Sequence, residues 1–333
     1  MTPDDTDALF AAERWLKEGR RVALGTVVNT WGSAPRPAGS QIVVRDDGAF
    51  VGSVSGGCVE GAVIEAARAA IGDGRVRHLE FGVQDVQAWS VGLACGGRIE
   101  IFVEPVAGDA ARRALTALNN ARRADRSMAR ALDLKTGEAR LIDPSTDTSD
   151  LGRAAAAATH ADRSTSVDVE GRSWFLAVSN PPVDLMIVGA VHVAQSLATM
   201  AMLLGLHVRI IDPRSSFATA ERFPGFCLTP EWPDEALARV PLGHRSAVVT
   251  LSHDPKIDDP ALAIALRSPA FYIGALGSKR THAARLSRLR DQGFDDAVLA
   301  RVHGPVGLAI GAKTPEEIAV SILAQIIERL RAG

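Results

Sequence analysis

The chain has 333 residues, of which 47% are hydrophobic and 23% charged, and a formal net charge of −2 at pH 7. Its length suggests two domains, and its near-neutral charge gives no indication of a protein that binds nucleic acid or anionic membranes. Three cysteines without a Cys-x-x-Cys pair argue against a disulfide framework or a zinc cage and favour a reducing cytoplasm.

The first part of the chain, residues 1–107, predicts a small α/β domain. It begins with an acidic, polar stretch unlike a signal peptide, and no apolar run in the chain reaches the roughly 18 residues of a membrane span. The pattern of apolar residues predicts one helix over 7–18 and another from 59 to about 71. Strands are expected at 21–28, 42–44, 50–54, 76–81 and 98–103.

The segment Ser55-Gly56-Gly57-Cys58-Val59-Glu60-Gly61 joins the third of these strands to its helix. Adjacent glycines let the backbone turn sharply and approach a ligand, and the following helix directs unpaired N–H groups and a positive dipole end outward. A cysteine in that place can have a lowered pKa and act as a ligand or a sulfur nucleophile. Taken alone, however, the segment favours a tight turn in which Cys58 is a buried filler.

A second Cys/Gly turn, Cys95-Gly96-Gly97, precedes the last strand of this domain. If the two turns converge, they form a pocket with two thiols and many free backbone N–H groups. Such a pocket suits a ligand that carries both phosphate and sulfur. Cys227 follows Phe223-Pro224-Gly225-Phe226 and is expected to be structural.

Residues 108–182 predict a connecting helix and hairpin segment. The helix is expected over 108–132 with a solvated, arginine-rich face, followed by a surface excursion over 143–166 and a hairpin over 167–178. Asn180-Pro181-Pro182 marks the clearest boundary in the sequence, because two successive prolines fit a semi-rigid linker.

From residue 183 to residue 333, strands alternate with helices, which predicts a Rossmann-like, doubly wound parallel sheet. Strands are expected at 183–188, 207–211, 247–251 and 271–273, and helices at 194–204, 260–266, 278–290 and 314–331. The fold class is therefore α/β, with an N-terminal α/β domain followed by a Rossmann-like domain.

The turn from Gly189 to Ala194 occupies the position of a dinucleotide fingerprint, and Asp212 follows at the distance of the ribose-binding acid. Val191 replaces the glycine that lets the backbone approach a pyrophosphate. The turn is thus equally consistent with a nucleotide site and with a Rossmann-like fold that binds no dinucleotide.

Two further motifs follow strand ends, where an open parallel sheet has its ligand crevice. Ser252-His253-Asp254 is one, and His253 is suited equally to a base and to a hydrogen-bonding cap. Gly277-Ser278-Lys279 is the other, and it opens a helix in an arrangement that favours anions.

Together these motifs resemble the XdhC/CoxI family. The resemblance rests on 30–36, 55–61 and 95–97 in the N-terminal half and on 212–214, 222–224, 252–254, 273–280 and 307–322 in the Rossmann half. It spares only about 108–166. One departure is Val191, because the family usually has Gly-Ala-Gly-His at this turn.

The resemblance implies a cytoplasmic accessory protein, more a cofactor chaperone than a turnover enzyme, for molybdenum hydroxylases of the xanthine dehydrogenase, aldehyde oxidase and CO dehydrogenase type. Family members bind the molybdenum cofactor, as molybdopterin or its dinucleotide form, and promote its sulfuration and insertion. The implied partners are an apo hydroxylase and a cysteine desulfurase-type sulfur donor, with no nucleic acid and no membrane. A homodimer is compatible with the resemblance.

The resemblance also implies a set of site residues, with Cys58 and Cys95 as the reactive thiols that contact molybdenum or its sulfur. The implied cofactor-binding residues are Ser55, Gly56, Gly57, Glu60, Gly96, Gly97, Gly189, Ala190, His192, Asp212, Arg214, His253, Asp254, Gly277, Ser278 and Lys279. Two alternatives stay open. One is an NAD(P)-dependent oxidoreductase that uses the Rossmann domain, and the other is a nonenzymatic scaffold that docks a sulfur donor to a hydroxylase.

Overall fold

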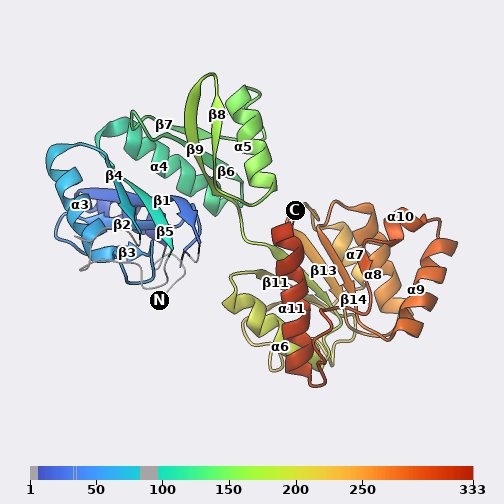
Figure 1. The fold of residues 1–333 in the computed structure, drawn as a ribbon. Coiled ribbons are helices and arrows are strands. Elements are labelled where there is room, and N and C mark those ends of the chain that lie inside the picture. Colours follow the sequence, from blue (N-terminus) through green and yellow to red (C-terminus); the bar gives the residue numbers. More distant parts are fainter. Residues whose placement is uncertain (1–6, 33, 35, 83–96, 333) are drawn as a thin grey trace. The chain divides into compact units, whose positions relative to one another are not determined.

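The computed structural model describes residues 7–32, 34, 36–82 and 97–332. The chain divides into two compact units, Met1–Pro181 and Pro182–Gly333, each with its own hydrophobic clusters (Figure 1). The finer boundary at residue 107 stays a prediction.

The first sheet of unit 1 is antiparallel, with its strands in the order β3-β2-β1-β5-β4. Side chains alternate along β1, so that Val22 and Leu24 pack under α2 while Ala23 and Val27 pack under α3 on the other face. The predicted elements are confirmed as α2 (Ala8–Lys17), β1 (Val22–Trp31), β2 (Gln41–Arg45), β3 (Phe50–Gly52), α3 (Glu60–Asp73), β4 (Arg77–Phe81) and β5 (Arg98–Pro105).

A second antiparallel sheet, in the order β7-β6-β9-β8, completes unit 1 and corrects the expectation for residues 108–182. The helix expected over 108–132 ends at Arg123 and is followed by a strand from residue 128, and the surface excursion expected over 143–166 contains a helix. The elements are α4 (Gly108–Arg123), β6 (Met128–Asp133), β7 (Ala139–Ile142), α5 (Asp150–His160), β8 (Thr165–Val169) and β9 (Arg172–Ser179). The hairpin, here β8–β9, is confirmed, and the connecting helix is confirmed over 108–123.

Two local features explain these differences. Helix α5 has a polar start, capped by Ser149, but its alanines 155 and 158 pack against Trp174 and Leu176. The arginines at the end of α4 are not a purely solvated face, because Arg122 binds Asp7 with both guanidinium Nη atoms, at 2.9 and 2.5 Å. The structure of residues 108–182 therefore depends on the packing of small apolar side chains and on ion pairs with residues distant in the sequence.

Unit 2 is the predicted doubly wound sheet, with six parallel strands in the order β12-β11-β10-β13-β14-β15. Its strands are β10 (Asp184–Val188), β11 (His207–Ile211), β12 (Cys227–Thr229), β13 (Ser246–Thr250), β14 (Tyr272–Ala275) and β15 (Val302–His303). Its helices are α6 (His192–Leu203), α7 (Pro233–Ala238), α8 (Pro255–Arg267), α9 (Lys279–Asp291), α10 (Asp296–Leu299) and α11 (Pro315–Ala332). The short elements β12, β15, α7 and α10 were not predicted.

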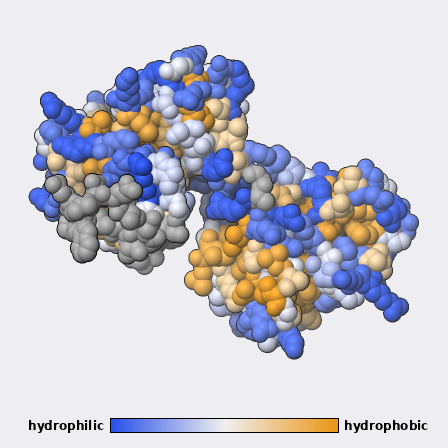
Figure 2. Space-filling model, viewed as in Figure 1, coloured by the Kyte–Doolittle hydropathy of each residue, from blue (hydrophilic) through white to orange (hydrophobic). Residues whose placement is uncertain are grey.

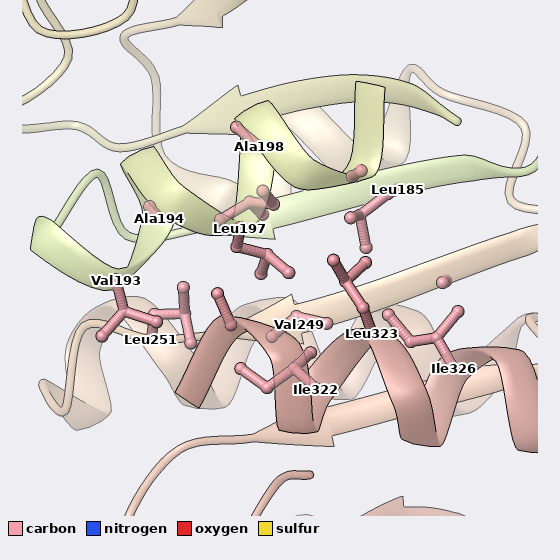
Figure 3. Packing of buried hydrophobic residues seen from close by; sticks show 14 of the residues in the cluster. Leu185, Val193, Ala194, Leu197, Ala198, Val249, Leu251, Ile322, Leu323 and Ile326 are labelled. Carbon is pink, nitrogen blue, oxygen red and sulfur yellow. The ribbon is translucent and has the colours of Figure 1, made fainter. Parts of the chain in front are cut away.

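Helices α6 and α11 cover one face of this sheet. Leu197 of α6 and Ile322 of α11 meet Leu185 and Val249 of the central strands (Figure 3). The other face packs against α7, α8, α9 and α10. The carboxyl ends of β10, β13 and β14 therefore lie at one edge of the sheet, with a turn following each of them.

The outer surface of unit 2 has an exposed apolar area (Figure 2). The exposed apolar side chains of unit 2 include Met202, Leu203 and Leu204 at the end of α6 and Val320 and Ile327 on α11, each more than 40% exposed.

Candidate functional site

One carboxylate, that of Glu60 in the first turn of α3, organises the turn between β3 and α3. Its Oε1 accepts hydrogen bonds from the Ser53 hydroxyl at 2.8 Å and from the backbone N–H groups of residues 54–56 at 2.9–3.2 Å. Its Oε2 accepts from the Gly57 N–H at 2.9 Å and from the Ser55 hydroxyl. A single side chain thus binds residues 53–57, which include Ser55, Gly56 and Gly57 of the segment that was expected to bind a ligand.

The expectation that Gly56 and Gly57 offer free N–H groups is therefore wrong, because both donate to Glu60. Burial opposes ionisation of Glu60, but the hydrogen bonds from Ser55 and Ser53 outweigh it and lower its pKa to about 2. The turn carries a fixed negative charge at neutral pH, which makes it a poor receptor for phosphate through these N–H groups. Cofactor contact by residues 55–57 stays a prediction that must rest on other atoms.

The two glycines are required by backbone conformation. Gly56 and Gly57 have φ values of 77° and 118°, and a Cβ on either would meet none of the described residues within 4 Å. Cys58 follows directly and is exposed, so it is not the buried filler that the turn alone suggested.

Where the structure describes them, parts of the N-terminal motifs lie close to one another. Arg36 donates from Nε to the Ser53 carbonyl at 3.4 Å. A Cβ on Gly32 would stand 3.7 Å from the Cα of Gly97. Cys95 and Gly96 lie outside the described residues, so convergence of the two thiols stays a prediction.

The first Rossmann turn is held against the end of β13. Gly189 has φ 102°, and a Cβ there would stand 2.8 Å from the Ser252 nitrogen. Val191 precedes α6 without a side-chain cap, and His192, the first residue of the helix, is exposed. The turn has the close approach between Gly189 and Ser252 that is typical of a dinucleotide-binding fold, but Val191 takes the place of the second glycine.

Asp212 is fully buried and already has its hydrogen bonds. Its Oδ2 accepts from the Ala190 N–H at 2.7 Å and from Arg214 Nη2 at 2.6 Å, and its Oδ1 accepts from the Arg214 N–H and Nε at 3.0 and 2.9 Å. Burial opposes ionisation of Asp212, yet the hydrogen bonds from Arg214 dominate and hold its pKa below the usual range. A ribose hydroxyl would have to compete with these four bonds.

The Ser252-His253-Asp254 motif is a turn that starts α8. Asp254 caps the helix by accepting from the Lys256 N–H at 2.9 Å, and Ser252 donates its hydroxyl to Asp258 Oδ1 at 2.7 Å. His253 is exposed and has φ 63°, a conformation that is uncommon outside glycine. The motif leaves His253 as its one side chain directed to solvent.

Ser278 and Lys279 start α9 at the end of β14. The Ser278 hydroxyl accepts from the Thr281 N–H at 3.1 Å, and both Ser278 and Lys279 are exposed. Gly277 has φ 144° and precedes them. Ser278 is therefore a helix cap, and Lys279 is an exposed cation beside the same helix end.

A buried ion pair beneath these turns was missed by sequence reasoning. Arg285 and Asp258 are each 2% exposed, and Arg285 Nη2 lies 3.6 Å from Asp258 Oδ2 and donates to the Leu276 carbonyl at 2.8 Å. Burial raises the pKa of Asp258 and lowers that of Arg285. The sequence held only a weak signal for this pair, two charged residues at positions that face the core of α8 and α9.

Within the part of the chain that the structure describes, no group of three or more His, Cys, Asp or Glu side chains is placed to hold a metal ion. Metal contact by Cys58 and Cys95 stays a prediction. Across the same ranges, no helix has the length and apolar character needed to span a bilayer.

Comparison with known proteins gives matches over both units. The XdhC Rossmann domain matches residues 185–326, and the XdhC and CoxI family matches residues 15–82. The molybdenum cofactor insertion chaperone PaoD of Escherichia coli K12 is 31% identical, over 98% of this chain and 89% of its own. A Bacillus subtilis 168 protein, named as a probable xanthine dehydrogenase subunit, is 27% identical over 94% of each chain. A crystal structure described as a xanthine dehydrogenase of Bacillus halodurans has a TM-score of 0.76 at 25% identity, covering 97% of this chain and 96% of its own.

Proposed function

The chain belongs to the XdhC and CoxI family, and from that premise we propose that it is a molybdenum-cofactor chaperone for a molybdenum hydroxylase. The observation that carries the proposal is the 31% identity, over nearly the whole chain, to a protein named as a molybdenum cofactor insertion chaperone. The finer parts of the proposal are sulfuration of the cofactor, with a cysteine desulfurase-type donor, and insertion into an apo hydroxylase. In this role the cofactor is cargo, bound and released rather than turned over.

The proposed contact to the metal or its sulfur is Cys58. Its thiol is exposed, and it follows a turn that Glu60 fixes through several hydrogen bonds. A fixed turn presents the thiol without a large loss of backbone freedom on binding. Because molybdenum arrives already bound to its pterin, one protein thiolate suffices and no cage of several protein ligands is needed.

For the Rossmann unit, we propose only that it contacts the phosphate or nucleotide part of the cofactor. Lys279 and His253 are exposed at the carboxyl ends of its strands, and either is suited to the phosphate or nucleotide of the dinucleotide form. NAD(P) is a poorer candidate, since Asp212 already accepts four hydrogen bonds and Val191 stands where the backbone should approach a pyrophosphate. Nothing in the described geometry favours a nicotinamide-dependent reaction.

The test is retention of molybdenum cofactor by the purified protein after gel filtration, measured as bound molybdenum and bound pterin. Replacing Cys58→Ser should reduce retention at least about tenfold, which corresponds to about 1.4 kcal/mol. Cys227→Ser is the matched control, because Cys227 is also an exposed thiol but lies in unit 2. Cys95→Ser tests the second predicted thiol in the same way.

The outcomes separate the parts of the proposal. If the unaltered protein retains no cofactor, the chaperone function is wrong. If Cys58→Ser and Cys95→Ser both retain as much cofactor as Cys227→Ser, the chaperone function stands but neither thiol contributes to cofactor binding.

A further inference from the structure

A polar cavity of about 410 Å³ lies in unit 1 where the starts of α2 and β2, the end of β3, and strands β6 and β9 meet. Its volume falls within the range of roughly 300–1,000 Å³ that is usual for small-molecule sites. The residues that matter for its chemistry are Arg36, Gln41, Gly52, Arg122, Arg130 and Asp162.

The cavity is connected through the backbone at Gly52 to the turn that carries Cys58. Gly52 lines the cavity, and the next residue, Ser53, accepts from Arg36 Nε through its carbonyl and donates to Glu60 through its hydroxyl. Gly52 has φ 91°, and a Cβ there would stand 2.3 Å from the Gln41 carbonyl oxygen. The backbone that fixes the turn therefore also forms one wall of the cavity.

The arginines that line the cavity differ in whether a carboxylate binds them. Arg122 is bound by Asp7, and Arg130 is bound by Glu104 through two contacts at 2.5 and 2.6 Å. Arg36 is exposed, and among the described residues it forms no ion pair with a carboxylate, only a hydrogen bond to a carbonyl. Among the described residues, Arg36 is thus a cation at the cavity without a carboxylate partner, beside two guanidinium groups that each bind one.

The remaining lining offers both donors and acceptors. The amide of Gln41 donates to Thr26 Oγ1 at 3.4 Å and has a carbonyl oxygen beside it, and the carboxylate of Asp162 accepts from Asn180 Nδ2 at 2.8 Å through its Oδ1. A flat heterocycle with amino and ring N–H donors next to carbonyl and ring-nitrogen acceptors matches such a lining. Guanidinium planes also stack on flat aromatic rings and pair with anions.

A second cavity of about 480 Å³ in unit 1 is a weaker candidate. It shares Leu9, Leu118 and Arg130 with the first but is lined by a row of alanines from α4. Neither Arg36 nor Gly52 lines it. It therefore lacks both the unpaired cation and the connection to the Cys58 turn.

We propose that the polar cavity binds the pterin ring system of the molybdenum cofactor, with Arg36 facing the anionic groups attached to that ring. The assignment rests on the proposed chaperone function and deepens it by locating the cargo. It also gives the anion a receptor that the turn, with its N–H groups bound to Glu60, does not supply.

The experiment measures binding of metal-free molybdopterin to the full chain by equilibrium dialysis. Arg36→Ala should weaken binding at least about tenfold, and Arg36→Lys should recover part of it because the charge is kept and the plane is lost. Gln41→Leu should weaken binding by removing a polar partner without changing charge. Arg153→Ala is the matched control, an exposed arginine of unit 1 on α5 that lies outside the cavity lining, and should bind like the unaltered chain.

A competition arm separates the ring from the phosphate. A phosphate-free pterin should displace molybdopterin at lower concentration than inorganic phosphate does. Displacement by phosphate alone would overturn the assignment of the ring to this cavity.

Two other results would also be decisive. If the unaltered chain binds molybdopterin and Arg36→Ala binds it equally well, the cavity is wrong while the chaperone function stands. If the unaltered chain binds neither molybdopterin nor the metal-loaded cofactor, both proposals fail. Arg36 is exposed, so Arg36→Ala remains informative even if Gln41→Leu lowers stability.

Discussion

At the scale of single residues, the Glu60 side chain changes what the Gly-Gly turn can bind. A Gly-Gly turn before a helix usually leaves donors for an anion, but here the anion is part of the chain. The turn is then better understood as a rigid mount for Cys58 than as a phosphate nest.

Replacing Glu60→Gln should lower the free energy of unfolding of unit 1 by about 1–3 kcal/mol, the range for losing charged hydrogen bonds and leaving buried groups unpaired. The amide nitrogen of glutamine would face N–H groups that now donate to an oxygen. Denaturant unfolding measures the loss, and Glu65→Gln is the control, because Glu65 is an exposed residue of the same helix.

The effect of this substitution should depend on pH in a defined direction. The folded-state pKa of Glu60, about 2, lies below its ordinary value of 4.5, so its contribution is fully present above pH 4.5 and is lost as pH falls toward 2. The stability difference between the unaltered chain and Glu60→Gln should therefore shrink over that interval. A difference that stays constant from pH 6 to about pH 2.5 would show that the carboxylate is not the stabilising species.

At the scale of elements, the first Rossmann turn depends on a close approach between two strand ends. Gly189 combines a positive φ with a neighbour 2.8 Å from its would-be Cβ, whereas Gly205, at the end of α6, has φ 77° and nothing within 4 Å. A substitution at Gly205 therefore tests backbone strain alone, and a substitution at Gly189 tests backbone strain together with a steric clash.

Gly189→Ala should lower the free energy of unfolding of unit 2 by more than about 3 kcal/mol, since backbone strain of about 1–3 kcal/mol adds to a clash with Ser252. Gly205→Ala should incur only the strain, about 1 kcal/mol. Thermal unfolding of both variants checks the ranking. Equal losses would mean that the contact with Ser252 relaxes without cost.

The elements also show what a sequence can and cannot predict. The longer strands and helices of the Rossmann unit were predictable because they carry an apolar stripe of adequate length, as Leu197 and Ile322 illustrate, whereas the short β12, β15, α7 and α10 were not. The sheet β7-β6-β9-β8 was predicted only at its β8–β9 hairpin, because the helical pattern expected over 108–132 runs into β6, and α5 hides its buried alanines 155 and 158 behind a polar start. The cavity was out of reach for another reason, since Arg36, Arg130 and Asn180 come from distant parts of the chain.

At the scale of the whole molecule, the proposed chemistry divides between the units. The Cys58 turn and the polar cavity belong to unit 1, and the Rossmann turns with Lys279 and His253 belong to unit 2. Such a division requires that each unit be stable as a folded domain of its own. Their separate hydrophobic clusters and the proline-rich junction at 180–182 meet that requirement.

Calorimetric unfolding should therefore show two transitions, one for each unit. Leu24→Ala and Leu197→Ala are a matched pair, because both leucines are at most 2% exposed and lie in clusters of unit 1 and unit 2 respectively. Each substitution should remove about 2–5 kcal/mol from its own unit by lost burial and the cavity left behind. Leu24→Ala should lower only one transition and Leu197→Ala only the other. If either variant moved both transitions together, the units would be energetically coupled, and loss of cofactor in a variant of one unit could no longer be assigned to that unit alone.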